Sequence, residues 1–175
     1  MDFKDTIRKL EPEIIKSIQD AIRIKSVEEE PLQGMPFGSG PYQALDFMLK
    51  LGESMGFETK NLDGYAGHID FGEGDETVGI LAHVDVVPEG DGWTYPPYGG
   101  EIHNGKIYGR GTMDDKGPAV IALYAMKALA DSGVKPGRKI RLILGANEES
   151  RWECMDHYFK NEEPPTLAFT PDADF

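Results

Sequence analysis

The sequence lacks the features that define several large protein classes. It contains one cysteine, Cys154, among 175 residues, which excludes an internal disulfide and a cysteine-based structural zinc site. It has no apolar run approaching the roughly 20 residues that a membrane-spanning helix needs. The N-terminal residues Met1 to Asp5 also lack the apolar core of a secretion signal. We therefore expect a cytoplasmic protein.

Positive charge is also scarce. Lysine and arginine number 18 against 31 aspartates and glutamates, which gives a formal net charge of −13 at pH 7. This balance argues against a nucleic-acid partner and against anionic membranes, because both need a basic surface. The Gly-Lys-Ser/Thr phosphate loop and the Gly-x-Ser-x-Gly nucleophile elbow are absent as well. Nothing in the sequence indicates an oligomeric state.

What the sequence does contain is an alternation of helical and strand patterns. Apolar residues at three-to-four spacing predict helices over 3–25, about 42–55 and about 117–131, and a short helix ending at Phe159. Pro12 indicates either a kink or a fresh helix start, and the helix over 117–131 is apolar nearly all round, so it should be buried. The predicted strands cover 57–62, 65–71, 77–84, 139–146 and 166–169, with a hairpin over 101–108. We expect an α/β fold of three layers, α/β/α, around a mixed, largely parallel sheet.

The most informative stretch is the apolar run from Gly79 to Pro88, which contains His83 and Asp85. Side chains at i and i+2 of a strand share a face, so both groups would point the same way at the end of a buried strand. His83 could then ligate a metal ion while Asp85 holds the imidazole tautomer. Taken alone, the pattern is more typical of a partly buried histidine with an ordinary hydrogen bond.

Further acidic side chains fall where other elements would meet the same edge of the sheet. They are Asp114 and Asp115 before the third long helix, Glu148 and Glu149 after one strand, and Asp172 after the last strand. Sites in such sheets gather at the carboxyl ends of strands. An acidic residue before a helix can also be a simple cap, but a cap does not explain the glycines just upstream. One imidazole with several carboxylates suits zinc, manganese or cobalt, and a two-metal hydrolytic site is a reasonable hypothesis.

Four segments together resemble a known enzyme family. They are Ala82–Pro88, Gly109–Gly117, Asn147–Ser150 and Pro171-Asp172. In this order they resemble the co-catalytic zinc peptidases related to aminoacylase and carboxypeptidase G. Within that family the chain looks most like the bacterial PepV-type dipeptidases, which are carnosinase-like (Xaa-His) and β-Ala-Xaa dipeptidases. The loop Gly92–Gly100 supports this branch. The resemblance covers nearly the whole chain and implies zinc-dependent hydrolysis of a dipeptide or small peptide.

The resemblance also implies a role for each candidate residue. His83 and Asp172 would ligate one zinc ion, Glu149 would ligate a second, and Asp114 would bridge the two. Asp85 would orient His83, and Glu148 would act as general base and then as general acid. A cis peptide bond between Asp114 and Asp115 is implied as well.

Two features depart from the family pattern. Lys25 stands where the family commonly has proline. The second histidine ligand of the family comes from far downstream, beyond an inserted lid domain that also contacts substrate, and His68, His103 and His157 lie outside the motifs. The abrupt end at Pro171–Phe175 points the same way. We therefore expect residues 1–175 to be the N-terminal part of the catalytic domain, without its lid and C-terminal part, and weakly active or inactive alone.

Two alternatives stay open. An N-acyl amino acid deacylase or a carboxypeptidase of the same family would use the same chemistry on another substrate. A non-catalytic metal-binding or structural fragment would need the ligands alone. Glu148 as a proton shuttle has no use in such a module, which favours hydrolase ancestry.

Overall fold

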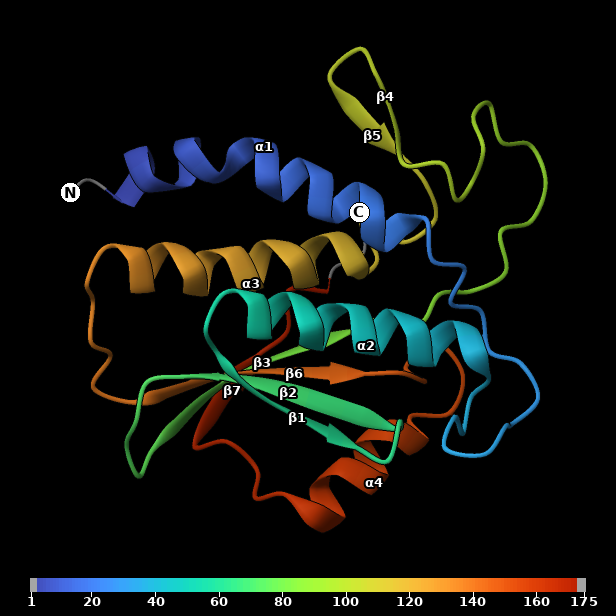
Figure 1. Cartoon of the computed structure of the whole chain (residues 1–175). Coiled ribbons are helices and arrows are strands. Elements are labelled where there is room, and N and C mark those ends of the chain that lie inside the picture. The colour runs from blue at the N-terminus through green and yellow to red at the C-terminus, as the bar shows by residue number, and fades with distance from the viewer. Residues whose placement is uncertain (1–2, 173–175) are drawn as a thin grey trace.

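The computed structural model describes residues 3–172. Residues 1–2 of the N-terminal stretch and residues 173–175 of the C-terminal stretch discussed above lie outside the described part. Along the described residues two helices come first, five strands follow, and helices and strands alternate after that (Figure 1). The elements are α1 (Phe3–Ile22), α2 (Ser39–Ser54), β1 (Glu58–Leu62), β2 (Ala66–Phe71), β3 (Thr77–His83), β4 (Glu101–His103), β5 (Lys106–Tyr108), α3 (Lys116–Asp131), β6 (Lys139–Gly145), α4 (Glu153–Asn161) and β7 (Leu167–Phe169).

Five of these strands form one sheet in the order β1-β2-β6-β3-β7. The β1–β2 and β2–β6 pairs are antiparallel, whereas β3 pairs in parallel with both β6 and β7. The sheet is therefore mixed, as expected, with β1, β6, β3 and β7 running in one direction and β2 running against them. The reason is the tight turn at Asp63-Gly64, which returns β2 antiparallel to β1 and inserts it beside β6. The predicted hairpin is present as β4 and β5, apart from the main sheet.

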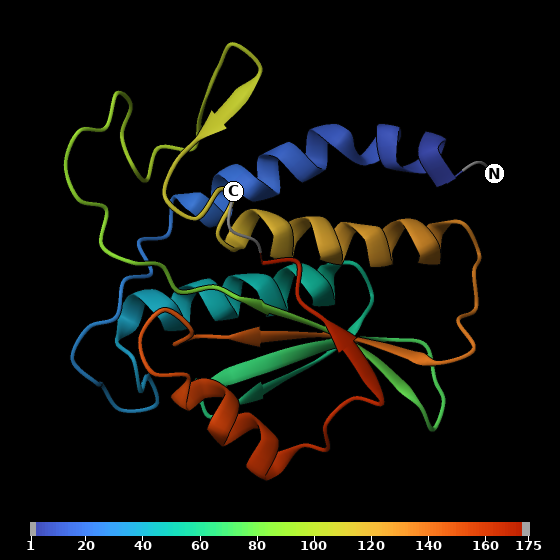
Figure 2. The same cartoon turned by 180° about the vertical axis from the view of Figure 1, so that it is seen from behind.

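The helices lie on both faces of this sheet (Figures 1 and 2). The α2 and α3 helices cover one face, α1 packs on the outer side of α3, and α4 covers the other face. The predicted three-layer α/β/α arrangement is confirmed. Within residues 3–172, no helix combines the length and apolar character that crossing a membrane requires.

Some helix boundaries differ from the prediction. The α1 helix passes through Pro12 without ending there. It stops at Ile22: the amide of Arg23 still bonds to the Gln19 carbonyl, but that of Ile24 closes a tighter turn on Ala21. The α2 helix begins at Ser39, three residues early, since Pro41 fits the first turn, where no amide hydrogen is needed. The α3 helix is not buried all round, because Ile121 is 54% exposed.

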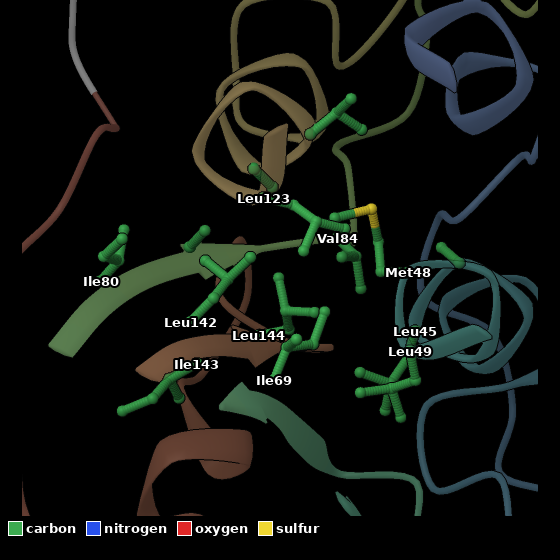
Figure 3. Close-up of a cluster of buried hydrophobic side chains, with 14 of the residues drawn as sticks. Leu45, Met48, Leu49, Ile69, Ile80, Val84, Leu123, Leu142, Ile143 and Leu144 are labelled. Atoms are coloured by element: carbon green, nitrogen blue, oxygen red, sulfur yellow. The ribbon is translucent and has the colours of Figure 1, made fainter. Parts of the chain in front are cut away.

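The core explains why the second half of β6, from Leu142 to Gly145, is an apolar run. Figure 3 shows Leu142 and Leu144 pointing toward α2 and α3, while Ile143 points to the opposite side, toward α4. All three side chains are fully buried. Because β6 lies in the middle of the sheet with helices on both faces, every position along its second half needs an apolar side chain. This packing fixes the carboxyl ends of β3, β6 and β7 at one edge.

Candidate metal centre

Four segments that are distant in sequence meet around one imidazole. The Nε2 atom of His83, at the end of β3, lies 2.9 Å from Asp114 Oδ1, 3.8 Å from Glu148 Oε2 and 3.7 Å from Asp172 Oδ2. One ligand atom each from His83, Asp114 and Glu149 can be chosen so that all lie within 4.8 Å of one another. The same holds for His83, Glu148 and Asp172. The structure thus brings together five side chains: the four expected metal ligands and the expected general base, Glu148.

The chemistry of this donor set fits a divalent cation. One imidazole nitrogen and several carboxylate oxygens are the ligands that zinc, manganese and cobalt accept. The His83 side chain is 2% exposed, whereas that of Asp114 is 53% exposed, so the imidazole forms the floor of the site and Asp114 its open side. An ion could therefore reach the site from solvent and still contact a buried nitrogen.

The electrostatics of the site favour added positive charge. Burial disfavours the imidazolium form of His83, but the carboxylates of Asp85, Asp115 and Glu148 outweigh this effect and raise its pKa to about 10. Burial also raises the pKa values of Glu148 and Glu149, and the neighbouring carboxylates add to that shift while His83 opposes it. A group of carboxylates this close together gains from a cation among them.

Asp85 holds more of the site than the sequence indicates. The predicted contact with the imidazole is present, since His83 Nδ1 lies 3.4 Å from Asp85 Oδ1 and 3.1 Å from the Asp85 backbone oxygen. The two carboxylate oxygens of Asp85 also accept hydrogen bonds from the backbone amides of Glu148 and Glu149, each at 3.0 Å. Asp85 therefore links the end of β3 to the segment after β6.

Asp115 is a buried part of the site to which sequence reasoning gave no role. Its Oδ2 atom accepts a hydrogen bond from the backbone amide of His83 at 3.1 Å, and its Oδ1 atom is buried with no hydrogen-bond partner among the described residues. Burial raises the pKa of Asp115 to about 7. Asp115 precedes α3, but within residues 3–172 its side chain makes no capping bond to that helix, so the capping interpretation does not apply to it. The Asp114–Asp115 peptide bond is cis, as the resemblance implies.

The glycines around Asp114 allow the chain to fold closely on itself. A Cβ atom at Gly117 would lie 2.0 Å from the carbonyl oxygen of Thr112, and Gly111 has a φ of +88° that disfavours other residues. The amide of Gly117 donates to the carbonyl of Gly111 at 3.0 Å. The close backbone approach expected from the sequence is therefore present, and the partner is the segment's own backbone.

The other three histidines have partners away from this centre. His68 lies in the sheet with its Nδ1 atom 2.8 Å from the Tyr158 hydroxyl. His103 Nε2 lies 2.8 Å from Glu101 Oε2, and its ring stacks on Tyr95 at a centroid distance of 3.7 Å. His157, 27% exposed in its side chain, lies 3.0 Å from an Asp63 carboxylate oxygen. Among the described residues, His83 is thus the one imidazole at the site, as the sequence motifs indicate.

Comparison with known proteins gives a consistent picture. A family model described as "Peptidase family M20/M25/M40" matches residues 79–175. Over 173 residues the chain is 53% identical to the Bacillus subtilis (strain 168) protein named "Putative dipeptidase YtjP", covering 98% of this chain and 37% of that protein. It is 44% identical over 175 residues to a similarly named Staphylococcus saprophyticus protein, again covering 37% of it. The chain therefore spans a little over a third of the length of these curated relatives.

The fold has solved counterparts as well. The crystal structure of human carnosine dipeptidase 1 matches with a TM-score of 0.84 at 20% identity, over 99% of this chain and 41% of that one. The dipeptidase Dug1p of Saccharomyces cerevisiae matches with a TM-score of 0.78 at 24% identity, over 91% of this chain and 37% of that one. At these identities the likeness is one of fold.

Proposed function

The chain belongs to peptidase family M20/M25/M40, and from this membership we propose that it is part of a zinc-dependent dipeptidase. The observation that carries the proposal is the convergence of Asp114, Glu148, Glu149 and Asp172 on the buried imidazole of His83. The names of the relatives, dipeptidases in both curated cases, support the substrate class.

In this proposal the ligands divide between two ions. His83 and Asp172 would hold one ion, Glu149 would hold the other, and Asp114 would contribute a ligand to both. Asp85 orients the imidazole through the contact with Nδ1. A bound pair of such ions supplies Lewis-acid polarisation of the peptide carbonyl and a water of lowered pKa. Manganese or cobalt suits the same donor set.

Glu148 is the proposed general base and acid. Its carboxylate takes a proton from the attacking water and delivers it to the leaving amine, so that the peptide bond breaks with no net change in the enzyme. Burial raises the pKa of Glu148, and nearby carboxylates add to the shift, which moves it toward the range in which a carboxyl can both accept and return a proton near neutral pH. Its side chain is 26% exposed, so it can still reach a substrate.

We also propose that residues 1–175 are the N-terminal part of a larger catalytic domain, with a lid domain and a C-terminal part elsewhere in the protein. Two observations support this. The curated relatives are far longer than the chain, which covers 37% of each. Two apolar side chains that line a pocket together with His83, Glu148 and Asp172, those of Trp152 and Phe169, are 53% and 55% exposed, as expected for a surface that another part of the same protein covers. On this basis the chain alone is weakly active or inactive.

The test compares the chain with a version extended to the length of its curated relatives. We expect the extended version to bind about two zinc ions and to cleave dipeptides, and the chain alone to bind one ion or fewer. Glu148→Gln in the extended version should keep the metal and lose turnover by about 10²- to 10⁴-fold. Glu149→Gln should instead lose one ion.

The matched control is Glu73→Gln, which changes an exposed glutamate in the loop between β2 and β3 and should keep both metal and activity. An extended version without metal, or one in which Glu148→Gln turns over normally, contradicts the proposal. Cleavage of N-acyl amino acids or of longer peptides at their carboxyl end, with dipeptides left intact, would keep the chemistry and replace the substrate.

A further inference from the structure

The short segment Ile24–Ser26, just beyond the end of α1, contacts both segments that carry the central proposed ligands. On the β3 side, the Ser26 hydroxyl donates to the Val84 carbonyl at 2.6 Å, and the Val86 amide donates to the Ser26 carbonyl at 3.0 Å. These two bonds flank Asp85 and begin one residue after His83. Ser26 is fully buried. It therefore holds the backbone of the segment from which the imidazole and its orienting carboxylate project.

Lys116, in the segment that carries Asp114, also contacts the segment Ile24–Ser26, through Ile24. Its ammonium group donates to the carbonyl oxygens of Ile24 at 2.6 Å and Ala21 at 3.1 Å. Carbonyls at the end of a helix lack partners within the helix, and a lysine is well suited to satisfy them. Lys116 is 1% exposed and lies two residues after Asp114. It therefore ties the Asp114 segment to the end of α1.

The segment between these two contacts is itself held in place. A Cβ atom at Gly40, in the first turn of α2, would lie 2.1 Å from the carbonyl oxygen of Lys25. The Lys25 ammonium group lies 2.9 Å from Glu89 Oε1, in the loop that follows β3. The segment Ile24–Ser26 is thus packed against α2 and paired with the loop after β3. Because it is held in this way, it can fix the distance between the segment that carries His83 and the segment that carries Asp114.

We propose that Ser26 and Lys116 are positioning residues that set the distance between His83 and Asp114. Ser26 acts through the backbone of Val84 and Val86, and Lys116 acts through its own backbone connection to Asp114. Both are anchored on Ile24–Ser26. The inference rests on the proposed function, because it takes His83 and Asp114 as metal ligands.

A control variant distinguishes the positioning role of Ser26 from a purely structural one. It removes another buried hydroxyl group, that of Ser17. Ser17 Oγ lies 2.9 Å from the Tyr124 hydroxyl, between α1 and α3, and Ser17 is 8% exposed. In the part of the chain that the structure describes, neither Ser17 nor Tyr124 has a side-chain bond to the segments that carry His83 and Asp114. Ser17→Ala therefore removes a hydroxyl group from α1, the helix that leads into Ile24–Ser26. It leaves the bonds of Ser26 and Lys116 in place.

The experiment titrates Co²⁺ into the extended version carrying Ser26→Ala, Lys116→Met or Ser17→Ala. Visible absorption of bound cobalt reports the geometry of its ligands, and thermal unfolding without metal reports stability. We expect Ser26→Ala and Lys116→Met to raise the Kd for Co²⁺ by about tenfold or more and to change the absorption bands. Ser17→Ala should lower the unfolding temperature comparably and keep the wild-type Kd and spectrum.

The outcomes separate the two proposals. If wild-type protein binds Co²⁺ and Ser26→Ala binds it with the same Kd and spectrum, the positioning role is wrong while the metal site stands. If wild-type protein shows no cobalt bands, the proposed metal site fails and the positioning role fails with it. Should Lys116→Met not fold, Ser26→Ala decides the result alone, because the removal of one hydroxyl leaves the bond from Val86 to the Ser26 carbonyl in place.

Discussion

The carboxylate of Asp85 accepts a hydrogen bond from the backbone amide of Glu148, 63 residues further along the chain, at 3.0 Å. Its second oxygen accepts the amide of Glu149 at the same distance. These bonds pull the segment after β6 against the end of β3. They are the reason that two adjacent glutamates lie beside the imidazole of His83 instead of extending into solvent.

Replacing Asp85 by asparagine should therefore weaken metal binding and leave the fold intact. An asparagine has one acceptor oxygen for two amides, and its NH₂ group would face either an amide hydrogen or the imidazole. We expect the Kd for Zn²⁺ to rise by about 10- to 100-fold, as is usual when a group that orients a ligand is lost. Isothermal titration of the extended version measures it. Asp46→Asn, which changes an exposed pair with Lys50, is the control, and equal affinities for the two variants would rule out the orienting role.

A second prediction concerns the glycine that closes the Asp114 segment. Gly117→Ala would place a methyl group 2.0 Å from the Thr112 carbonyl oxygen, so the backbone must move. We expect a loss of about 1–3 kcal/mol in the free energy of unfolding, the usual cost of forcing a group into a filled space. Gly137→Ala is the control, because a Cβ atom there meets nothing within 4 Å in the described structure. Urea unfolding of the metal-free chain measures both, and a Gly117→Ala protein as stable as Gly137→Ala would contradict the prediction.

Two arginines near the start of β6 allow a comparison of a buried ion pair with an exposed one in their contributions to the free energy of unfolding. Arg141 donates to both Asp70 oxygens at 2.8 and 2.7 Å and to Glu162 at 3.2 Å, and its side chain is 13% exposed. Arg138 donates to Glu76 at 2.8 Å, and that pair is 51% and 54% exposed. Arg141→Met should cost about 3 kcal/mol or more, because it takes both hydrogen bonds from the largely buried Asp70 carboxylate, whose other cation, Lys139, lies 3.8 Å away. Glu162 keeps its bond from Lys60. Arg138→Met should cost less than about 1 kcal/mol. Similar losses in thermal or urea unfolding would show that burial does not decide the strength of these pairs.

The convergence of the candidate site residues could be predicted from the sequence because these residues stand in local patterns. An apolar run ending in His83, a glycine-rich segment before Asp114, and acidic residues directly after two strands are each visible within about ten residues. Since parallel strands meet at one edge of a sheet, these positions could be expected to converge without knowledge of the side-chain packing. The same local patterns predicted which segments form helices and which form strands. They did not predict that β2 pairs antiparallel with β6, because that pairing joins segments distant in the sequence.

The supporting contacts could not be predicted in the same way. The bonds from Asp85 to two amides, from Asp115 to the His83 amide, and from Lys116 to the end of α1 join a side chain to backbone atoms far along the chain. A backbone amide or carbonyl is present at almost every position, so its partner leaves no mark in the sequence. The one available hint was that Asp115 and Lys116 follow Asp114 directly, which indicates proximity but not the direction of either side chain.

The last prediction concerns pH. His68 is 5% exposed, between β2 and α4, and burial, with a smaller contribution from the Arg141 cation, lowers its pKa to about 4. A histidine in the unfolded chain takes up its proton near pH 6.5. Between about pH 6.5 and 4 the unfolded chain therefore binds more protons than the folded chain, and the free energy of unfolding falls as the pH falls. The full loss, reached below about pH 4, is on the order of 3 kcal/mol.

His68→Asn isolates this contribution. The asparagine side-chain oxygen can replace Nδ1 as the partner of the Tyr158 hydroxyl, which lies 2.8 Å away, but it does not titrate. Urea unfolding of the metal-free chain from pH 7.5 to 4.5 should show wild-type protein losing stability more steeply than the variant. Titration of the acidic cluster around His83 is common to both proteins and cancels in the difference. Parallel curves would mean that the folded chain protonates His68 as readily as the unfolded chain does, and that burial between β2 and α4 does not exclude the charge.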